Sequence, residues 1–389
     1  MSSPADRPSL GQAPTIGVGM LGYGFMGRAH SSAFRSIRHM TWPPPLLPEL
    51  VSIAGRTEAA VADAAEEFGF AEHVTDWHAL LADPRIELFD NTGPNNVHIE
   101  PSIAAAEAGK HVVCEKPLGR TADESFEAWQ RVDAAGVKHM CAFNYRFVPA
   151  VRLARDLIAA GELGEVLHFR SVYLQDWLVD PSVANLWRLD KSIAGSGALG
   201  DLGAHVIDLA RYLVDEIATV SGELRTFNPV RDGSEVDVDD AFAATVEFER
   251  GALGTIEASR FCAGRKNGLR FEVNGTLGSL AFNLERLNEL ELSEGNGGFR
   301  TILVTNPDHP YLEYWWPPGH VLGWEHTFVH ELHHLLTAIR VDGDVAPHGA
   351  TFEDGYRAAE VCDAIVRSSQ TAEQITLTYR DSDAGRAST

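Results

Sequence analysis

The sequence has few of the features that mark secreted, membrane-spanning or disulfide-bonded proteins. Only four cysteines occur, at positions 114, 141, 262 and 362, and no two of them form a C-x-x-C pair. Free thiols in a reducing compartment are therefore expected. No run of 18 apolar residues is present, which predicts no membrane span. Residues 1–14 are polar and proline-rich and lack the apolar core of a signal peptide, so we expect a disordered lead and a cytoplasmic protein.

Basic residues are also scarce. The 389 residues include 32 lysines and arginines against 55 aspartates and glutamates, a formal net charge of -23. A surface this acidic repels phosphate backbones and anionic membranes. Nucleic-acid and membrane partners are thereby disfavoured, and a neutral or cationic small molecule is the expected ligand. The length suffices for two domains, each with its own core.

Two patterns of secondary structure follow one another along the chain. Short apolar runs alternate with helical patterns over residues 15–143, which predicts a doubly wound parallel sheet with helices on both faces. Strand patterns follow in succession over residues 144–380, which predicts an α+β domain with a mostly antiparallel sheet; residues 381–389 are expected to form a tail. The helices expected to cover one face of the second sheet span residues 201–214, 326–339 and 352–368.

A glycine-rich turn lies in the first of these domains. Gly22, Gly24 and Gly27 form the pattern G-x-G-x-x-G between a predicted strand and a predicted helix. In such a turn the first glycine permits the bend, the second lets a pyrophosphate approach the backbone, and the third lets helix and strand pack closely. The helix N-terminus then faces the phosphates. The domain is therefore predicted to be a Rossmann, dinucleotide-binding domain whose turn includes Phe25 and Met26; a glycine-rich turn in an unrelated α/β sheet is the alternative.

The residue after the second strand helps to select between NAD and NADP, because an acidic side chain there binds the ribose hydroxyls of NAD. Here Gly55, Arg56 and Thr57 follow the strand without an acidic residue. Arg56 can meet a 2′-phosphate, stack on adenine or lie in solvent, so NAD and NADP both stay open. The nearby segment 42–45, Trp-Pro-Pro-Pro, cannot form regular structure, and we expect it to be a loop near the cofactor cleft.

Two further groups of residues carry reactive side chains. Lys116 follows a predicted strand at the carboxyl edge of the parallel sheet, where such sheets bind ligands. A lysine there can hydrogen-bond a hydroxyl or exchange a proton with it, although an ordinary surface lysine is the alternative. Asp201 and His205 are four residues apart and share one face of a predicted helix. A carboxylate beside an imidazole can orient the ring and support its protonated form, although such pairs also occur as buried structural contacts.

Together these residues resemble the glucose–fructose oxidoreductase/inositol dehydrogenase family. The resemblance covers about residues 15–380 and rests on the segments 22–30, 92–98, 108–118, 144–155 and 197–213. It implies that Lys116, Asp201 and His205 are the catalytic residues. The further positions at which it implies cofactor contacts are Thr92, Pro94, Asn95, His98 and Glu115. The usual Thr-Pro-Asn of the family is Gly93-Pro94-Asn95 here, so a threonine contact is lost or taken over by Thr92.

Within that family the chain looks most similar to the levoglucosan dehydrogenase branch, in segments 143–146, 173–177, 187–188 and 191–197. This resemblance implies NAD(P)-dependent, reversible oxidation of a sugar ring hydroxyl at C3, and a homodimer or homotetramer. Aromatic, amide and guanidinium groups suit a sugar ring. Besides the catalytic residues, the substrate-binding candidates are Tyr145, Arg146, Gln175, Trp187 and Trp324. His205 is the expected proton acceptor, with Lys116 holding the same hydroxyl; the opposite assignment stays open.

Several other functions compete with this interpretation. Residues 330–334 fit H-E-x-x-H on a predicted helix, a pattern of zinc hydrolases. Because a complete dinucleotide fold does not need such a centre, we expect packing roles for His330 and His334 and no metal. An inositol dehydrogenase or keto-sugar reductase of the same fold would change only the substrate. A dinucleotide-sensing regulator would keep the fold without catalysis.

Overall fold

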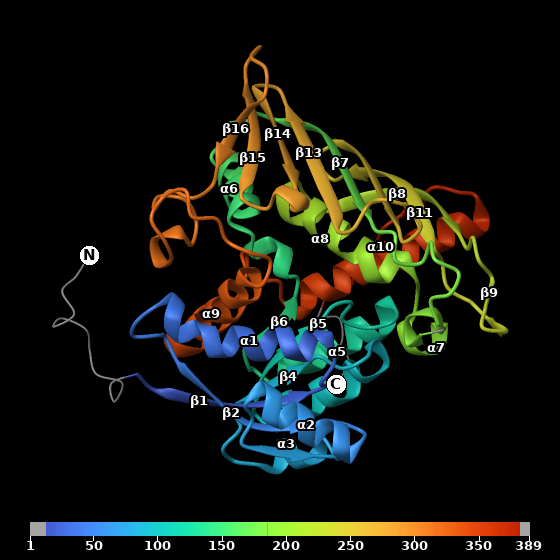
Figure 1. Cartoon of the computed structure of the whole chain (residues 1–389). Helices are drawn as coiled ribbons and strands as arrows, with labels where there is room; N and C mark the ends of the chain where they lie inside the picture. Colours follow the sequence, from blue (N-terminus) through green and yellow to red (C-terminus); the bar gives the residue numbers. More distant parts are fainter. Residues whose placement is uncertain (1–12, 185, 382–389) are drawn as a thin grey trace. The chain divides into compact units, whose positions relative to one another are not determined.

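The computed structural model describes residues 13–184 and 186–381 (Figure 1). The chain forms two compact units, each discontinuous in sequence. Unit 1 consists of Met1–Leu118, Phe126–Phe147 and Gly323–Glu353, and unit 2 of Gly119–Ser125, Val148–Leu322 and Asp354–Thr389. The predicted lead over residues 1–14 and the predicted tail over 381–389 lie almost entirely outside the described residues.

Unit 1 contains a six-stranded parallel sheet in the order β3-β2-β1-β4-β5-β6. Its strands are β1 (Thr15–Leu21), β2 (Leu47–Ala54), β3 (Glu72–Val74), β4 (Leu88–Asn91), β5 (His111–Glu115) and β6 (His139–Ala142). Most residues of the four strands β1, β4, β5 and β6 are buried, as expected for a parallel sheet covered on both faces. The strand order reverses between β1 and β4, and ligands bind outside the carboxyl ends of the strands at such a point. The predicted Rossmann fold is confirmed.

The helices of unit 1 cover this sheet. They are α1 (Phe25–Met40), α2 (Glu58–Phe68), α3 (His78–Ala82), α4 (Ile99–Glu107), most of α5 (Ala122–Ala134) and α9 (His326–Val341), with the short 3-10 turns η3 (Asn95–Val97) and η4 (Asn144–Phe147). Helix α1 buries Gly27, His30, Phe34 and Ile37, a spacing of three and four residues that places them on one stripe. A histidine is thus part of the helix face that packs on the sheet.

Unit 2 contains a nine-stranded sheet in the order β16-β15-β14-β13-β7-β12-β11-β8-β17. Its strands are β7 (Val166–Leu174), β8 (Ile217–Arg225), β11 (Ala241–Phe248), β12 (Leu253–Ser259), β13 (Gly268–Gly275), β14 (Gly278–Asn283), β15 (Glu289–Glu294), β16 (Arg300–Leu303) and β17 (Ile375–Thr376); β9 (Val230–Arg231) and β10 (Ser234–Glu235) form a separate ribbon. All neighbouring strands of the large sheet are antiparallel except β7 and β12. The predicted, mostly antiparallel α+β domain is confirmed.

Helices cover one face of this second sheet. They are α6 (Pro149–Ala159), the short α7 (Lys191–Ala194), α8 (Ala204–Leu213) and most of α10 (Phe352–Thr371), and the 3-10 turns η5 (Trp187–Leu189), η7 (Leu284–Arg286) and η8 (Leu312–Tyr314) also belong to unit 2. Along β11 and β12 buried residues alternate with exposed ones, so one face of the sheet is packed and the other is not. Among the described residues, no helix is long and apolar enough to cross a membrane.

Two sequence-based expectations about position were wrong. Helix α9 was expected over the second sheet, but it belongs to unit 1 and packs on α1. Phe328 of α9 lies against His30 of α1, and Trp324, just before α9, lies against Phe25. The Trp-Pro-Pro-Pro loop, expected near the cofactor cleft, joins the end of α1 to the start of β2. Since β2 runs parallel to β1, with Leu47 paired to Thr15, this loop lies at the amino edge of the sheet, opposite the ligand-binding edge.

Candidate active site

The glycine turn between β1 and α1 has the shape that a dinucleotide requires. Gly22 has a φ of +104°, and a Cβ on it would lie 2.8 Å from backbone atoms of Thr92 and Gly93 at the end of β4. A Cβ on Gly27 would lie 2.5 Å from the carbonyl oxygen of Gly22, so helix and strand are in close contact. A Cβ on Gly24, in contrast, would meet no atom within 4 Å. The turn is therefore closed toward the protein and open where a pyrophosphate would approach the N-terminus of α1.

An aromatic stack adjoins this turn. The ring of Phe25 is 66% exposed and stacks on Trp324, with centroids 5.5 Å apart and an interplanar angle of 14°. Trp324 in turn meets the Phe328 ring edge-on at 4.7 Å. Trp324 was considered a substrate-binding residue; in unit 1 it lies against the turn expected to hold the cofactor, beside Phe25 and near the half-buried Met26.

The segment after β4 supports the turn from the other side. The Thr92 hydroxyl is within 3.1 Å of the carbonyl oxygens of both Leu21 and Gly22, to which it donates. A Cβ on Gly93 would lie 2.6 Å from a methyl group of Val97, so a side chain at this position would require Val97 to shift. Thr92 thus supports the turn, and its expected contact with the cofactor stays a prediction. The next residues, Pro94 and the half-buried Asn95, lead into η3.

Lys116 directly follows β5 at the same carboxyl edge, and its neighbours hold its backbone. The Glu115 carboxylate accepts the Lys116 backbone N–H at 3.0 Å through Oε2. The buried ring of His98 lies with Nδ1 2.8 Å from the Pro117 carbonyl oxygen and Nε2 2.9 Å from that of Gly93. Burial lowers the pKa of His98. The two His98 nitrogens thus bridge two loops of the protein, and the expected contact of His98 with the cofactor stays a prediction.

Arg56 lies at the carboxyl end of β2 and is exposed. A Cβ on the preceding Gly55 would overlap the ring of Tyr23, so the Tyr23 side chain of the glycine turn packs directly on Gly55. The Arg56 guanidinium is accessible beside the turn, as binding to a ribose phosphate or to adenine would require.

In unit 2, Asp201 and His205 do not lie on one uninterrupted α-helix. Asp201 belongs to the π-helical turn η6 (Leu199–Gly203), and His205 is the second residue of α8. The expected continuous helix over 201–214 is therefore wrong in its first turn. A Cβ on Gly203 would lie 2.6 Å from the Phe242 ring, so this turn packs tightly on β11. Single π-helical turns are frequent at functional sites.

Two buried residues that the sequence analysis did not single out hold this turn. The Asp239 carboxylate accepts the backbone N–H groups of Gly197 at 2.7 Å and Leu199 at 2.8 Å. The fully buried Arg260 donates to the Asp239 carbonyl oxygen at 2.8 Å. Asp201 is among the carboxylates whose charge acts on Arg260, although burial lowers the pKa of this guanidinium overall. The sequence did offer a sign of these two supports. Asp239 and Asp240 directly precede β11, and Arg260 directly follows β12, the antiparallel partner of β11.

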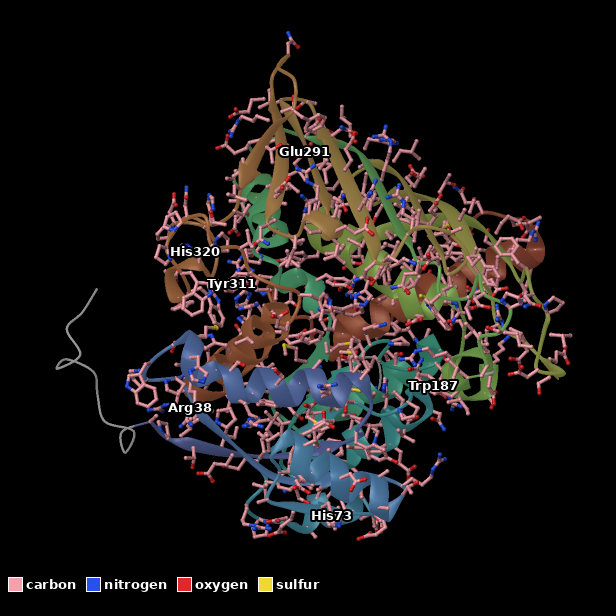
Figure 2. The ribbon with its side chains drawn as sticks, in the orientation of Figure 1. Arg38, His73, Trp187, Glu291, Tyr311 and His320 are labelled. Carbon is pink, nitrogen blue, oxygen red and sulfur yellow. The ribbon has the colours of Figure 1, made fainter. Side chains whose placement is uncertain are left out.

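Unit 2 also brings one substrate candidate close to His205. The rings of Tyr173 and His205 meet edge-on at 5.9 Å. The Tyr173 hydroxyl donates to Asn267 Oδ1 at 2.6 Å, and the Gln175 amide donates to the same oxygen at 2.9 Å. Gln175 therefore belongs to the polar network around His205, together with Tyr173 and Asn267, which were not proposed as site residues. Trp187 (labelled in Figure 2) lies in η5 with the Arg188 guanidinium 4.3 Å from its ring centroid.

The candidate residues are distributed over both units. In unit 1 the structure places the glycine turn, Arg56, Thr92, Pro94, Asn95, His98, Glu115, Lys116, the buried Tyr145 and Arg146 of η4, and Trp324; in unit 2 it places Gln175, Trp187, Asp201 and His205.

The H-E-x-x-H histidines of α9 have structural contacts. His330 Nδ1 lies 3.0 Å from the Phe147 carbonyl oxygen, and His334 Nε2 lies 2.7 Å from that of Val345. The described residues contain no group of three or more His, Cys, Asp or Glu side chains arranged to hold a metal ion.

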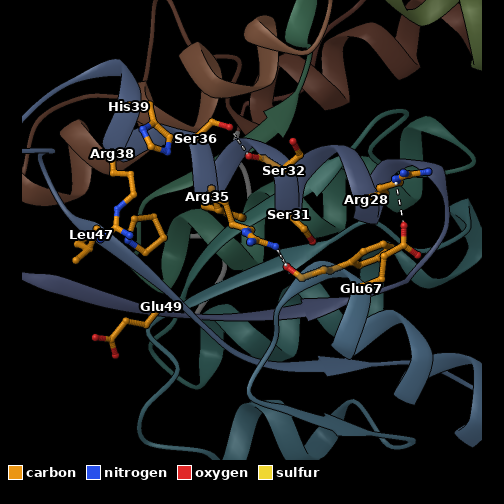
Figure 3. A pocket seen from close by; sticks show the side chains of 13 residues that line it. Arg28, Ser31, Ser32, Arg35, Ser36, Arg38, His39, Leu47, Glu49 and Glu67 are labelled. Atoms are coloured by element: carbon orange, nitrogen blue, oxygen red, sulfur yellow. Dashed lines mark hydrogen bonds and ion pairs between the residues drawn. The ribbon is translucent and has the colours of Figure 1, made fainter.

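A hollow of about 720 Å³ lies along the outer side of α1, away from these candidates (Figure 3). Its lining includes Arg28, Arg35, Arg38 and His39. Arg28 pairs with Glu67 at 3.4 Å, and Arg35 donates to the Phe68 carbonyl oxygen at 3.4 Å. Its lining is mostly charged or exposed, and it contains none of the candidate cofactor-binding or substrate-binding residues.

A Rossmann sheet with an open glycine turn at its switch point, followed by a lysine at the carboxyl end of β5, defines an NAD-binding oxidoreductase. Residues 16–143 match the oxidoreductase family with an NAD-binding Rossmann fold, and residues 151–281 match the GFO/IDH/MocA C-terminal domain. The chain belongs to the GFO/IDH/MocA oxidoreductase family, as the resemblance predicted.

Similar proteins include sugar and polyol dehydrogenases. Levoglucosan dehydrogenase of Pseudarthrobacter phenanthrenivorans is 44% identical over 91% of this chain and 96% of its own length. The scyllo-inositol 2-dehydrogenase (NAD(+)) of Bacillus subtilis is 32% identical over 66% of this chain and 72% of its own length. A solved levoglucosan dehydrogenase in complex with NADH and levoglucosan has a TM-score of 0.90 at 44% identity, covering 93% of this chain and 99% of that one.

Proposed function

We propose that this oxidoreductase catalyses the reversible oxidation of a ring hydroxyl, at C3, of a sugar, glycoside or anhydrosugar such as levoglucosan. The observation that carries the proposal is the position of Lys116, at the carboxyl end of β5 in the unit whose glycine turn is open toward a cofactor. The levoglucosan dehydrogenase with 44% identity supports the substrate class.

His205, Asp201 and Lys116 divide the proton chemistry in this proposal. His205 accepts the proton of the substrate hydroxyl, and Asp201 orients the ring and supports its charged form. Lys116 holds the same hydroxyl and stabilises negative charge as it develops on the oxygen. When bound, NAD⁺ would supply the acceptor for the hydride of the carbon that carries this hydroxyl. The Gln175–Asn267–Tyr173 network lies where it can hold His205 and present an amide to the sugar.

Gly22, Gly24 and Gly27 hold the pyrophosphate, while Thr92 supports the turn, and Asn95 and Glu115 lie at the edge expected to receive the nicotinamide half. NAD is the proposed cofactor, because the solved relative was obtained with NADH. The exposed Arg56 makes NADP the alternative. Tyr145, Arg146, Trp187 and Trp324 are proposed to complete the sugar site. A cytoplasmic homodimer or homotetramer is proposed from the sequence and the family.

A second candidate substrate is an inositol, which the 32% identical scyllo-inositol 2-dehydrogenase favours. A spectrophotometric screen for NADH or NADPH formation distinguishes the two. It should compare levoglucosan, glucose, methyl glucosides and inositols, each with NAD⁺ and NADP⁺. The proposal expects the highest kcat/KM with levoglucosan or a glucoside. Preference for an inositol would replace the substrate assignment, and reduction by none of these compounds would reject it.

A further inference from the structure

Three ionisable side chains form a buried cluster behind the candidate site in unit 1. His30 of α1, Asp90 of β4 and Glu115 of β5 are 0%, 0% and 5% exposed. His30 Nδ1 lies 3.0 Å and 3.1 Å from the two carboxylate oxygens of Asp90, and His30 Nε2 lies 3.1 Å from Glu115 Oε1. The cluster therefore joins the helix after the glycine turn to the strands that lead to Thr92 and Lys116.

The hydrogen-bond geometry favours a protonated His30. A neutral imidazole has one N–H and one lone pair, so it would direct the lone pair at a carboxylate oxygen. Between two ionised carboxylates, only the imidazolium can donate a hydrogen bond on both sides. Burial alone would lower the pKa of His30, but the charges and hydrogen bonds of Asp90 and Glu115 hold this pKa well above its usual value. Helix α9 adds the uncharged Phe328 ring, 5.5 Å from the imidazole.

Such a cluster is a weak source of stability, because desolvation of three charged groups offsets much of their attraction. Its effect on orientation is more specific. Glu115 is bound at both oxygens: Oε1 accepts from His30 Nε2, and Oε2 accepts from the Lys116 backbone N–H at 3.0 Å. A carboxylate fixed at both oxygens cannot rotate without losing one of these bonds.

The backbone on the other side of Lys116 is also held, since His98 Nδ1 lies 2.8 Å from the Pro117 carbonyl oxygen. The peptide group before Lys116 and the one after Pro117 are thus both anchored to buried residues. The ammonium group at the end of a flexible stem can be directed accurately only if its backbone is fixed.

We propose that His30 is a positioning residue for Lys116: held between Asp90 and Glu115, it fixes the Glu115 carboxylate that anchors the Lys116 backbone. The inference rests on the proposed role of Lys116. His30 lies under Phe328 and does not itself touch substrate. Its loss should misplace Lys116 and lower turnover while the glycine turn, and with it cofactor binding, stays intact.

A double-mutant cycle tests this coupling. His30→Asn, Lys116→Ala and the double variant are assayed for kcat with the best sugar substrate, and NADH binding is measured by fluorescence titration. His30→Asn should lower kcat at least about tenfold, as small misplacements of a reactive group do, and leave the NADH Kd within about threefold. In the Lys116→Ala background the same change should alter kcat by less than about twofold, because the residue through which His30 acts is gone.

His39→Asn is the matched control, since it makes the same substitution at an exposed position of the same helix (Figure 3). It should leave kcat and the NADH Kd unchanged. An equal loss from His30→Asn in the presence and absence of Lys116 would overturn the positioning role. If Lys116→Ala alone kept normal turnover, the proposed function would fail instead, so the two failures are distinguishable.

A second measurement needs no turnover and no loss of His30. In protein with ¹⁵N-labelled histidine rings, the His30 resonances should show both nitrogens protonated at pH values where exposed histidines are neutral. Asp90→Asn, which keeps the size of the side chain, should lower the pH at which His30 loses a proton, and it should reproduce a smaller kcat loss that also vanishes in Lys116→Ala. A neutral His30 ring in the unmodified protein would contradict the proposal.

Discussion

The two groups of candidate catalytic residues are held by different means. Lys116 in unit 1 follows a regular strand and depends on buried ionisable side chains, His30 and Glu115 above all. Asp201 and His205 in unit 2 lie on an irregular turn whose shape depends on backbone N–H groups bound by Asp239. The hydrogen bonds of a sheet fix the backbone position at the end of a strand, so a residue that follows it needs only its side-chain direction to be set. An irregular turn needs a partner for each exposed N–H group. The support of Lys116 in unit 1 should therefore depend on pH. The turn that carries Asp201 in unit 2 should depend on a single hydrogen-bond acceptor, the Asp239 carboxylate.

The largest effect is expected from Lys116→Ala. Removal of the ammonium group eliminates the hydrogen bond that we propose it makes to the reacting oxygen, and kcat should fall about 10³-fold, within the range for a positioned proton-transfer or charge-stabilising group. The free energy of unfolding should change little, because Lys116 is only half-buried. Steady-state assays and urea unfolding provide the two values. A fall in NADH affinity of similar size would show that Lys116 acts through cofactor binding.

His205→Ala should lower kcat by about 10²-fold, somewhat less than loss of Lys116, since solvent can replace part of a general base. The defect should be largest at low pH, where hydroxide is scarce, and should shrink as the pH rises. A pH series of kcat for the variant and the unmodified protein measures this. If His205→Ala is the more damaging change at every pH, the roles of the two residues should be revised toward a dominant His205.

Asp239→Asn tests the turn of unit 2. The amide has one acceptor oxygen for the N–H groups of Gly197 and Leu199 and presents an N–H₂ to one of them. A buried unsatisfied N–H costs about 1–3 kcal/mol, so the free energy of unfolding should fall by that amount. We also expect about a tenfold loss of kcat from disorder around Asp201. Asp308→Asn, at an exposed position, is the control. Unchanged stability in Asp239→Asn would remove the claim that this carboxylate holds the turn.

The response to pH should separate the two units. The pKa of His30 is raised in the folded chain by Asp90 of β4 and Glu115 of β5, so its stabilising contribution is complete below the unfolded pKa and is lost as the pH rises through the folded value. The difference in unfolding free energy between the unmodified protein and His30→Asn should therefore shrink toward alkaline pH. Denaturant unfolding at a series of pH values checks this, with His39→Asn as the control. A difference that stays constant with pH would argue against a charged His30.

The smallest effect is expected from Arg56→Ala. If Arg56 meets a 2′-phosphate, KM for NADP⁺ should rise about three- to tenfold, as for loss of one exposed charge contact, with KM for NAD⁺ nearly unchanged. Arg38→Ala, on the outer side of α1, is the control. Equal changes for both cofactors would assign Arg56 to adenine stacking.

Much of unit 1 could be predicted from the sequence because its signals are local. The glycine turn, the apolar strands and the Ala-rich helices can each be predicted from neighbouring residues alone. Strand β1 and helix α2 begin and end at the predicted residues. The position of α9 was missed because it depends on packing between segments almost 300 residues apart, such as Phe25 and Trp324. An apolar stripe predicts which face of a helix is buried, but it does not predict which element packs against that face.

The candidate residues themselves were recognisable by type and order, whereas their supports were not. His30 and Asp90 lie within segments that have the pattern of an ordinary helix and strand. A charged residue directly after the apolar Leu88 and Phe89 was the available sign for Asp90. The π-helical turn at Asp201 was likewise invisible, since it arises from contacts of Gly203 with Phe242 and of Gly197 with Asp239. Residue spacing assumes a regular helix, and tertiary contacts decide where a helix departs from it.

The most direct test of this account is the rate of NADH formation from NAD⁺ and levoglucosan by the purified protein and by Lys116→Ala and His205→Ala. The account predicts clear turnover by the unmodified protein and losses of about 10³-fold and about 10²-fold in the two variants, with NADH binding retained. Turnover that is absent from the unmodified protein with every sugar tested, or near-normal in both variants, would contradict it.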